Sequence, residues 1–420
     1  MGTKFILRST RAALVAAVML VAAVARAGGF LVYDVSGEAV AKGSAVVASS
    51  TAPDAVWYNP AGIAFGAPYQ FSLGTVYTTA DNTFSPKGGG KSASAIPGNY
   101  FLPHLFASVR ATDWLYIGVG GYSVFGLGTE WPKDWVGRVS TIKSALTTAT
   151  INPTLTFKPH KDVAIGIGFD AVRSALDAKQ GLPEPIGGTA RFGAAGWGYG
   201  ANVGVMWRAI PDKLSVGVTY RSRIKLVMDG RIDIAPRPEF LRDLPSGTVK
   251  TSLTLPDIIA FGVSFRPVPE VELGVDANIV TWSTYDKTVL KRNNGPDIVM
   301  NHGWTDALVL RVGVDWATPA KGLNVRAGLI YDKTPVPDEL LEPSTPDADQ
   351  IDVCLGLGYQ YKWLKADLGY QLVAFFPHNA TTGVLGPEGK YKTLAHFLAL
   401  TLTFQFGERA KPSLAVSATP

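Results

Sequence analysis

Few side chains in this sequence have the types and spacing that catalysis or metal binding requires. Histidine occurs at His104, His160, His302, His378 and His396. No two of these have the separation of metal ligands on one element, so we predict no metal site and no cofactor. The single cysteine, Cys354, cannot form an internal disulfide. A serine hydrolase needs a serine, a histidine and an orienting group on one face, and His396 has no identifiable partners. We predict that the chain is not an enzyme.

Three closely spaced cations are candidates for binding an anion. Between Leu214 and Leu226 alternate residues are apolar, and Arg221, Arg223 and Lys225 fall on the opposite, polar face. An unpaired charge on an enclosed face is costly, so these cations are candidate partners for a substrate carboxylate. The alternative is a structural network completed by acids, which is the more common role. The acids available for it are Glu272, Asp276, Asp315 and Asp352.

The first 27 residues have the pattern of a secretory signal peptide. Basic residues precede an apolar run from Ala12 to Ala25, and Ala25-Arg26-Ala27 forms a small-x-small cleavage site. A spanning helix needs roughly 20 apolar residues, more than this run supplies. We therefore predict export followed by cleavage after residue 27.

Cleavage would remove most of the net positive charge. Residues 1–27 contain four basic and no acidic residues, so 39 basic against 34 acidic residues becomes 35 against 34. A nucleic-acid-binding protein needs a basic patch on the mature fold. The charge balance therefore argues against a nucleic-acid partner.

Period-two alternation of apolar and small or polar residues runs through the chain from Tyr69 onward. The alternating segments are 69–80, 102–110, 114–125, 144–157, 162–175, 195–208, 214–226, 250–266, 270–283, 304–316, 322–332, 350–361, 364–376 and 391–406. Several of them carry tryptophan or tyrosine at the edges of the apolar band, as membrane interfaces select. Their number is even, as in single-chain bacterial outer-membrane barrels.

The connections between these segments alternate in length. Residues 81–101, 126–143 and 377–390 form long connections, whereas 111–113 and 158–161 are tight turns. Outer-membrane barrels place long loops outside the cell and tight turns in the periplasm. We predict an all-β fold, a 14-stranded antiparallel transmembrane barrel over residues 69–406, in the outer membrane of a Gram-negative bacterium. Residues 407–420 are predicted to form a periplasmic tail.

Two segments contain residues that disturb a strand ladder. Pro256 lacks a backbone N–H and predicts a bulge or break in the eighth segment. The third segment carries five glycines and could kink out of the ladder. The alternative for most glycines is packing room on the inner side of the wall. These glycines are Gly118, Gly120, Gly121, Gly126 and Gly128.

The stretch Ala52–Phe65, APDAVWYNPAGIAF, suits neither a helix interior nor a central strand. Pro60 fixes its own φ and pushes Asn59 toward extended geometry, directly after the large aromatics Trp57 and Tyr58. A plain linker into the first strand would not need several large apolar side chains around a fixed turn. The stretch is predicted to fold around Asn59-Pro60-Ala61 and to bury its aromatic residues.

The chain resembles the FadL/TodX family of outer-membrane transporters of hydrophobic compounds along nearly its whole mature length. The matching motifs are Gly29-Phe30, Asn59-Pro60-Ala61, GLGTEW from Gly126, WGYGANVGVMW from Trp197, LSVGVTYRSRIKL from Leu214, LTLPD from Leu253, YDKTPVP from Tyr331 and the closing FQF. Asn-Pro-Ala alone is common, but the colinear set is much more specific. The resemblance implies that residues 28–68 form a hatch inside the barrel, with a hydrophobic pocket above it.

The resemblance also implies a mechanism. A kinked third strand would open a lateral exit toward the outer leaflet, with Ser123 and Gly126 matching the small residues that line it. The expected function is passive uptake of hydrophobic compounds, most of all long-chain fatty acids, by a monomer surrounded by outer-membrane lipid and lipopolysaccharide. Monoaromatic hydrocarbon uptake and a general open porin are the alternatives. The connection 176–194 is shorter than the helical loop that builds an outer capture groove in the fatty-acid members.

Overall fold

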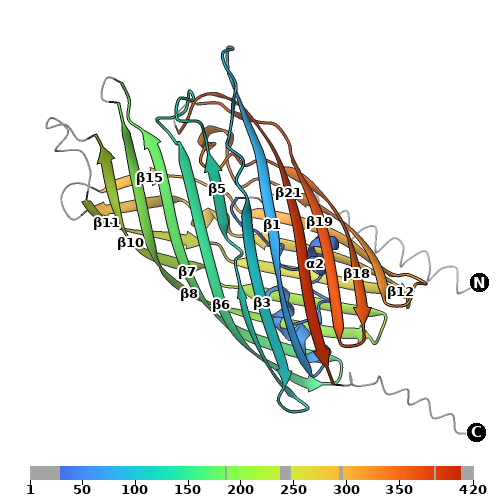
Figure 1. The fold of residues 1–420 in the computed structure, drawn as a ribbon. Coiled ribbons are helices and arrows are strands. Elements are labelled where there is room, and N and C mark those ends of the chain that lie inside the picture. Colours follow the sequence, from blue (N-terminus) through green and yellow to red (C-terminus); the bar gives the residue numbers. More distant parts are fainter. Residues whose placement is uncertain (1–28, 185–186, 237–246, 293–296, 383–384, 408–420) are drawn as a thin grey trace, which may run out of the picture.

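The computed structural model describes residues 29–184, 187–236, 247–292, 297–382 and 385–407. The predicted signal peptide and the predicted tail after Gly407 lie outside these residues. Within the described residues, fourteen antiparallel wall strands form a closed barrel, shown in Figure 1. Closure is made by the first and last strands, with Tyr69 paired to Phe406 and Pro86 paired to Gly389. The predicted fold class is confirmed.

The wall follows the chain order. It consists of β1 (Tyr69–Pro86), β3 (Tyr100–Arg110), β4 (Leu115–Tyr122) with β5 (Gly126–Glu130), β6 (Lys143–His160), β7 (Val163–Gly181), β8 (Thr189–Ile210), β9 (Leu214–Arg221) with β10 (Ile224–Ala235), β11 (Gly247–Leu255) with β12 (Ile258–Val268), β13 (Val271–Val280), β16 (Ala307–Ala317), β17 (Leu323–Asp332), β18 (Gln350–Tyr361), β19 (Leu364–Phe375) and β21 (Gly389–Phe406). Short elements decorate the end with the long loops: β2 (Ala93–Ser94), η3 (Trp282–Thr284), β14 (Lys287–Arg292), β15 (Ile298–Asn301), η4 (Asp338–Leu340) and β20 (His378–Ala380). No helix among the described residues is long and apolar enough to cross a membrane.

Alternation along each strand separates a lipid-facing surface from an inner surface. In β18, Ile351, Val353 and Leu355 are exposed on the outside, while Asp352 and Cys354 are buried inside. This arrangement is the inverse of a soluble protein, because the outer face meets hydrocarbon and the inner face meets protein and water. The alternation predicted from the sequence is therefore present in the wall.

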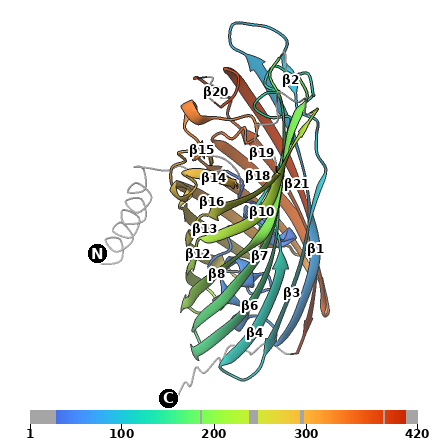
Figure 2. The ribbon, with the colours of Figure 1, turned by 90° about the vertical axis from the view of Figure 1, so that its left-hand side faces the viewer.

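Residues 29–65 lie inside the barrel and account for its buried core. They form α2 (Gly37–Ala41), α3 (Ala55–Tyr58) and η1 (Pro60–Phe65), which appear in blue within the ring of strands in Figures 1 and 2. The segment runs from Gly29, hydrogen-bonded to Asp347 in a long loop, to the start of β1 at the tight-turn end. Non-strand backbone is tolerated at membrane depth where protein encloses it.

Glycines on the inner face of the wall make room for this segment. A Cβ on any of five of them would overlap the backbone or Cβ of residues 42–48, so the close approach requires glycine. The five are Gly217, Gly262, Gly274, Gly313 and Gly328. They lie in adjacent strands and include the directly opposite pairs Gly217–Gly262 and Gly274–Gly313. Much of the unusual glycine content thus serves packing between the wall and the enclosed segment.

The break predicted at Pro256 is confirmed. Strand β11 ends at Leu255 and β12 begins at Ile258. Because proline donates no ladder hydrogen bond, the wall strand is interrupted there.

Two predictions about strand boundaries are wrong. Segment 214–226 is not one strand, because β9 ends at Arg221 and β10 begins at Ile224 with the opposite parity. The backbone N–H of Arg223 is taken by the Asp257 carboxylate, 2.9 Å away, instead of continuing the ladder. The predicted connection 176–194 is largely strand, since β7 extends to Gly181 and β8 begins at Thr189.

Candidate substrate cavity

A cavity of about 850 Å³ lies between the start of the enclosed segment and the wall. Residues 29–34 form one side of it, and strands from both ends of the barrel sequence form the other. Its apolar lining includes Phe30, Leu31, Phe125, Val309 and Val373. Cavities of this size and character bind drug-sized apolar molecules in other proteins.

The third wall strand is interrupted beside this cavity. Strand β4 pairs with β3 from Leu105 to Arg110, but within the described residues β5 pairs only with β6. Residues 100–104 of β3 consequently have a strand partner on the β1 side alone in this part of the wall. Figure 1 shows β5 set apart from the end of β3.

The enclosed segment holds the interrupted backbone. Val32 N donates to Val124 O at 2.8 Å, and Gly126 N donates to Phe30 O at 3.0 Å. The backbone between β4 and β5 therefore exchanges wall hydrogen bonds for bonds to residues inside the barrel. These bonds satisfy the backbone N–H and C=O groups between β4 and β5, which is necessary because hydrocarbon contains no water to bond them.

The cavity reaches the lipid-facing surface through this interruption. Its lining includes Phe101 and Ile151, which belong to the outer surface and are 66% and 57% exposed. Leu73 and Leu105, also exposed on the outside, line it as well. One continuous space thus connects the inside of the barrel with the surface that meets lipid.

The inner end of the cavity is polar and contains one arginine among several acids. The Arg311 guanidinium lies 4.6 Å from the centroid of the Tyr33 ring, and its Nη1 donates to Gly43 O at 3.5 Å. Asp34, Asp332 and Asp352 line the same end. Among the described side chains, Arg311 Nε, Asp332 Oδ1 and Asp352 Oδ1 are buried and lack a hydrogen-bond partner. Buried polar atoms without a partner are uncommon, so the polar groups at this end of the cavity are incompletely satisfied.

Comparison with known proteins shows which family the chain belongs to. The family model described as "Outer membrane protein transport protein (OMPP1/FadL/TodX)" matches residues 18–406. The chain belongs to this family. It is an outer-membrane transporter of hydrophobic compounds in a Gram-negative bacterium, and members of the family are transport channels rather than enzymes.

Similar proteins cover almost the whole chain. The long-chain fatty acid transport protein of Escherichia coli O6:H1 (strain CFT073) is 25% identical, over 90% of this chain and 93% of its own. Outer membrane protein P1 of Haemophilus influenzae (strain Rd) is 22% identical, over 94% and 98% of the two chains. A Pseudomonas aeruginosa FadL homologue superimposes with a TM-score of 0.79 at 19% identity, covering 90% of this chain and all of that structure. The structure of the P. putida toluene transporter TodX superimposes with a TM-score of 0.70 at 16% identity, covering 92% of this chain and all of that structure.

The two small residues matched to the family's lateral opening lie at the interruption. Ser123 and Gly126 both line the cavity. A Cβ on Gly126 would meet only the Leu146 carbonyl oxygen, at 3.7 Å, so the space beside it is open. Ser123 and Gly126 therefore lie between the end of β4 and the first residue of β5, and their role in an opening stays a prediction.

Gly29 and Phe30 lie at the loop end of the cavity. Gly29 has a φ of 83° and leaves no room for a side chain beside the rings of Trp282 and Trp304. The Phe30 ring lies 4.7 Å from the Trp282 ring and 5.5 Å from the Tyr285 ring, measured between centroids. These aromatic contacts cover the cavity beneath the long loops.

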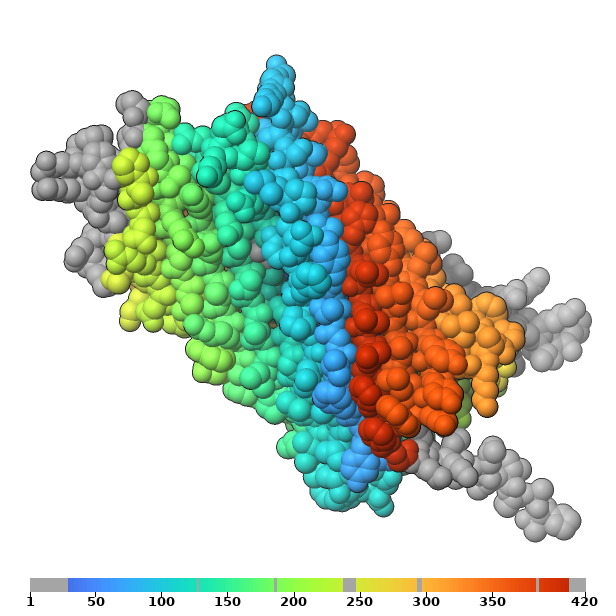
Figure 3. Space-filling view, viewed as in Figure 1, coloured from blue at the N-terminus to red at the C-terminus, as the bar shows by residue number. Residues whose placement is uncertain are grey.

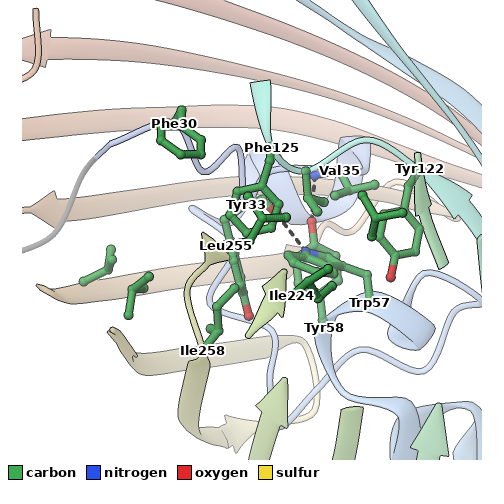
Figure 4. Packing of buried hydrophobic residues seen from close by; sticks show 14 of the residues in the cluster. Phe30, Tyr33, Val35, Trp57, Tyr58, Tyr122, Phe125, Ile224, Leu255 and Ile258 are labelled. Carbon is green, nitrogen blue, oxygen red and sulfur yellow. Dashed lines mark hydrogen bonds between the residues drawn. The ribbon is translucent and has the colours of Figure 1, made fainter. Parts of the chain in front are cut away.

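The residues around Asn59 are all buried and fasten the enclosed segment to the wall. Asn59 Nδ2 donates to Val47 O at 2.8 Å and to Val205 O at 3.1 Å, while its Oδ1 accepts from Ala61 N. Trp57 and Tyr58 bond back to the start of the segment, through Tyr33 O and Val35 N, as Figure 4 shows for the cluster. Pro60 O accepts a hydrogen bond from Thr156 in β6.

Arg221 faces inward, but it does not line the cavity. It is 7% exposed, forms an ion pair with Asp170 and lies 4.4 Å from the Trp57 ring. Its Nη2 donates to Trp57 O at 3.2 Å. The arginine therefore connects α3 to the wall.

The prediction that Arg223 and Lys225 share the inner face with Arg221 is wrong. The shift of parity between β9 and β10 turns both side chains outward, where they are exposed, and places Ile224 inside. Arg223 Nη2 pairs with Asp257 Oδ2 at 2.7 Å.

Of the predicted inner acids, Glu272, Asp276 and Asp352 are buried and Asp315 is half-buried, and they pair with groups other than the three cations. Glu272 pairs with Lys42 of the enclosed segment at 2.6 Å, and Asp276 accepts from Val47 N at 2.9 Å. Asp315 pairs with Arg326. Sequence reasoning did not select Arg311, although the alternation in 308–316 already places this residue on the polar face.

Proposed function

We propose that this transporter is a passive uptake channel for long-chain fatty acids. The fatty acid binds in the 850 Å³ cavity and leaves laterally between β3 and β5. The observation that carries the proposal is the continuous space from Arg311 to the exposed side chains of Phe101 and Ile151. Curated relatives named as long-chain fatty acid transport proteins support it.

Apolar packing supplies enough binding energy for such a substrate. Transfer of each CH₂ group from water to an apolar site is worth roughly 0.8 kcal/mol. A long acyl chain is therefore held without specific polar contacts, and downhill diffusion into the outer leaflet requires no energy source. The lateral route also avoids the enclosed segment that fills the barrel.

Residues 28–68 act in this proposal as a hatch that closes the barrel to water and ions. The support is that the described part, 29–65, is almost entirely buried and is fastened at several heights of the wall. A general open porin would need an unfilled lumen. Planar-bilayer recordings that showed large, steady ohmic channels would contradict the hatch.

Arg311 is the cation available to a carboxylate inside the cavity. The earlier candidate Arg221 is separated from the cavity by its contacts with Asp170 and Trp57. Arg223 and Lys225 are on the outside. Arg311 lines the cavity, and a guanidinium pairs well with a carboxylate.

Uptake of monoaromatic hydrocarbons is the second candidate. The observation that favours it is the excess of acids over cations around Arg311, namely Asp34, Asp332 and Asp352. Ionised carboxylates near the headgroup would repel a fatty acid and leave an uncharged ligand unaffected. The solved TodX structure is described as that of a toluene transporter.

Displacement of a fluorescent fatty acid from the purified protein distinguishes these candidates. For fatty acids, Arg311→Gln should weaken oleate binding by about tenfold, the usual value of a charge-assisted hydrogen bond, and spare toluene and decane. Arg173→Gln, which changes an exposed arginine on the outer face, is the matched control and should leave both unchanged. If the protein bound toluene but not oleate, and Arg311→Gln did not change toluene binding, uptake of aromatic hydrocarbons would be the function. If neither class bound, the transporter proposal would be untenable.

A further inference from the structure

Strands β6, β7, β8, β10 and β11 continue well beyond the apolar band of the barrel. On the outside of β8, Trp207 and Trp197 are ten positions apart. At a rise of about 3.3 Å per residue and a tilt of about 40°, this separation spans about 25 Å, the height of an outer-membrane apolar band. Trp197 therefore marks its outer boundary, and β8 extends eight residues further, to Thr189. The projecting strands are seen at the upper left of Figures 1 and 3.

Three cations occupy one row on the outer face of this projection. Lys143, Lys179 and Arg191 are neighbours in β6, β7 and β8, and the row ends at Glu130 of β5, opposite Lys143, and at Asp233 of β10, opposite Arg191. Asp177 pairs with two of them, at 3.1 Å from Lys143 Nζ and 2.8 Å from Arg191 Nε. Lys179 has no carboxylate within ion-pair distance among the described residues. Like charges directly opposite each other destabilise a sheet, so the row is suited to an external anion.

Further cations surround the row. The basic residues that face outward at or beyond the level of Trp197 are Lys143, Arg173, Lys179, Arg191, Arg231 and Lys250, and the acids are Asp177, Asp229 and Asp233, with Glu130 on the adjacent β5. Six cations against four acids leave a net charge of +2. Arg173 lies over the Trp197 ring, at 5.7 Å from its centroid, and so sits at the membrane boundary itself. We call these residues the basic face.

The centre of the basic face is flat. Between Arg173 and the row of three cations, the outer surface is made of small side chains around the Asp177 carboxylate, namely Ala145, Thr147, Ala175, Gly193 and Ala195. A Cβ on Gly193 would meet no atom within 4 Å. Small side chains at this level let a bulky headgroup approach the strands while longer cationic side chains reach around it.

We propose that the basic face binds the phosphate groups of lipopolysaccharide. The barrel lies in the outer membrane, and the face begins at the boundary of the apolar band, where phosphorylated sugars of the outer leaflet meet the protein. Clustered lysine and arginine next to a membrane boundary attract anionic headgroups, and arginine binds phosphate through paired N–H donors. The flat centre accommodates the sugar, and the surrounding cations take the phosphates. This site is independent of which substrate the cavity carries.

The test compares bisphosphorylated with dephosphorylated lipid A binding to the purified full-length protein in detergent, measured by native mass spectrometry. The variant is Lys143→Gln, Lys179→Gln and Arg191→Gln combined. The control, Lys87→Gln, Lys390→Gln and Lys392→Gln combined, removes the same charge from exposed positions near β1 and β21. Heat-modifiable gel mobility and oleate binding establish that each variant is folded, since none of these residues lines the cavity.

The basic-face variant should bind bisphosphorylated lipid A at least about tenfold more weakly than the wild type, and the control should bind as the wild type does. Lys179→Gln alone, which leaves no acid without a partner, should show part of the loss. Equal binding by the basic-face variant and the wild type would overturn the proposal. So would an equal loss in the control, or wild-type binding of dephosphorylated lipid A as tight as that of the phosphorylated form.

Discussion

Asn59 joins three separate parts of the chain through one buried amide. It caps η1, bonds to Val47 within the enclosed segment, and bonds to Val205 in β8. The sequence predicts the turn, because Pro60 constrains it. The partner in β8, 146 residues away, depends on the tertiary fold and has no local signal.

Replacing Asn59 by alanine should loosen the enclosed segment without unfolding the barrel. The change removes the buried amide that donates to the carbonyl groups of Val47 and Val205, at a cost of roughly 1–3 kcal/mol. Leak conductance in planar bilayers should rise, while heat-modifiable gel mobility stays that of the folded barrel. If Asn59→Ala had the conductance and the transport rate of the wild type, Asn59-Pro60-Ala61 would be only a hinge.

Asp347 links the beginning of the enclosed segment to a long loop, and its pKa is raised. Its Oδ2 accepts from Gly29 N at 3.1 Å and from Thr334 Oγ1 at 2.5 Å. Burial raises the pKa of this carboxyl to about 6, although both hydrogen bonds lower it. Unfolded aspartate titrates near pH ~4, so between about 4 and 6 the folded protein binds a proton that the unfolded chain does not. Stability therefore rises as the pH falls through this window.

Asp347→Asn should remove this dependence while keeping an oxygen acceptor for Gly29. Between about pH 7.5 and about pH 5, the Tm of the wild type should increase relative to that of the variant by about 2 °C or more. Asp134→Asn, at an exposed loop position, is the control and should follow the wild type. If the Tm of Asp347→Asn and the Tm of the wild type changed equally with pH, this carboxyl would still be charged at pH 5.

At the scale of elements, alternation alone predicts most of the wall. All fourteen predicted segments overlap wall strands, and the break at Pro256 follows from the missing N–H. The break after Arg221 was not predicted, because it depends on Asp257 of the neighbouring strand capturing the N–H of Arg223. Because this break was missed, Arg223 and Lys225 were predicted to face inward with Arg221, whereas both face outward. The positions of Ser123 and Gly126 came from the family resemblance, since their residue types alone do not mark an opening.

The contact between α2 and the wall includes a buried ion pair whose energy can be measured. Lys42 and Glu272 are 2% and 9% exposed and 2.6 Å apart, and Arg266 also reaches Glu272. Lys42→Met leaves Glu272 with the half-exposed arginine only, at a cost of about 3 kcal/mol. Leak openings should become roughly 100-fold more frequent.

Adding Glu272→Gln to Lys42→Met is the control for this ion pair. Neutralising both partners removes the uncompensated charge and should restore most of the closed state. If the double variant leaked as much as Lys42→Met, the loss would come from the shape of the lysine rather than its charge.

At the scale of the whole molecule, one segment both fills the barrel and holds open its side. Residues 42–48 lie against the inner glycines, whereas residues 30–32 bond to the backbone between β4 and β5. The cavity lies between these two contacts and ends at the lipid-facing surface. The central claim of the proposed function is that substrate leaves through this opening.

The most direct test of this claim is oleate uptake through Gly126→Trp. The position lines the cavity, and a Cβ there makes only an ordinary contact with the Leu146 carbonyl oxygen, so an indole can extend into the opening. The control, Gly193→Trp, places the same side chain on the outer face of β8, where no atom lies within 4 Å of its Cβ. Uptake is measured with labelled oleate in cells that have this protein as their sole uptake route.

Gly126→Trp is expected to fold as the wild type does and to take up oleate at least about tenfold more slowly, while Gly193→Trp transports normally. Wild-type uptake by a folded Gly126→Trp variant would contradict lateral release and direct the substrate through the barrel toward the periplasm.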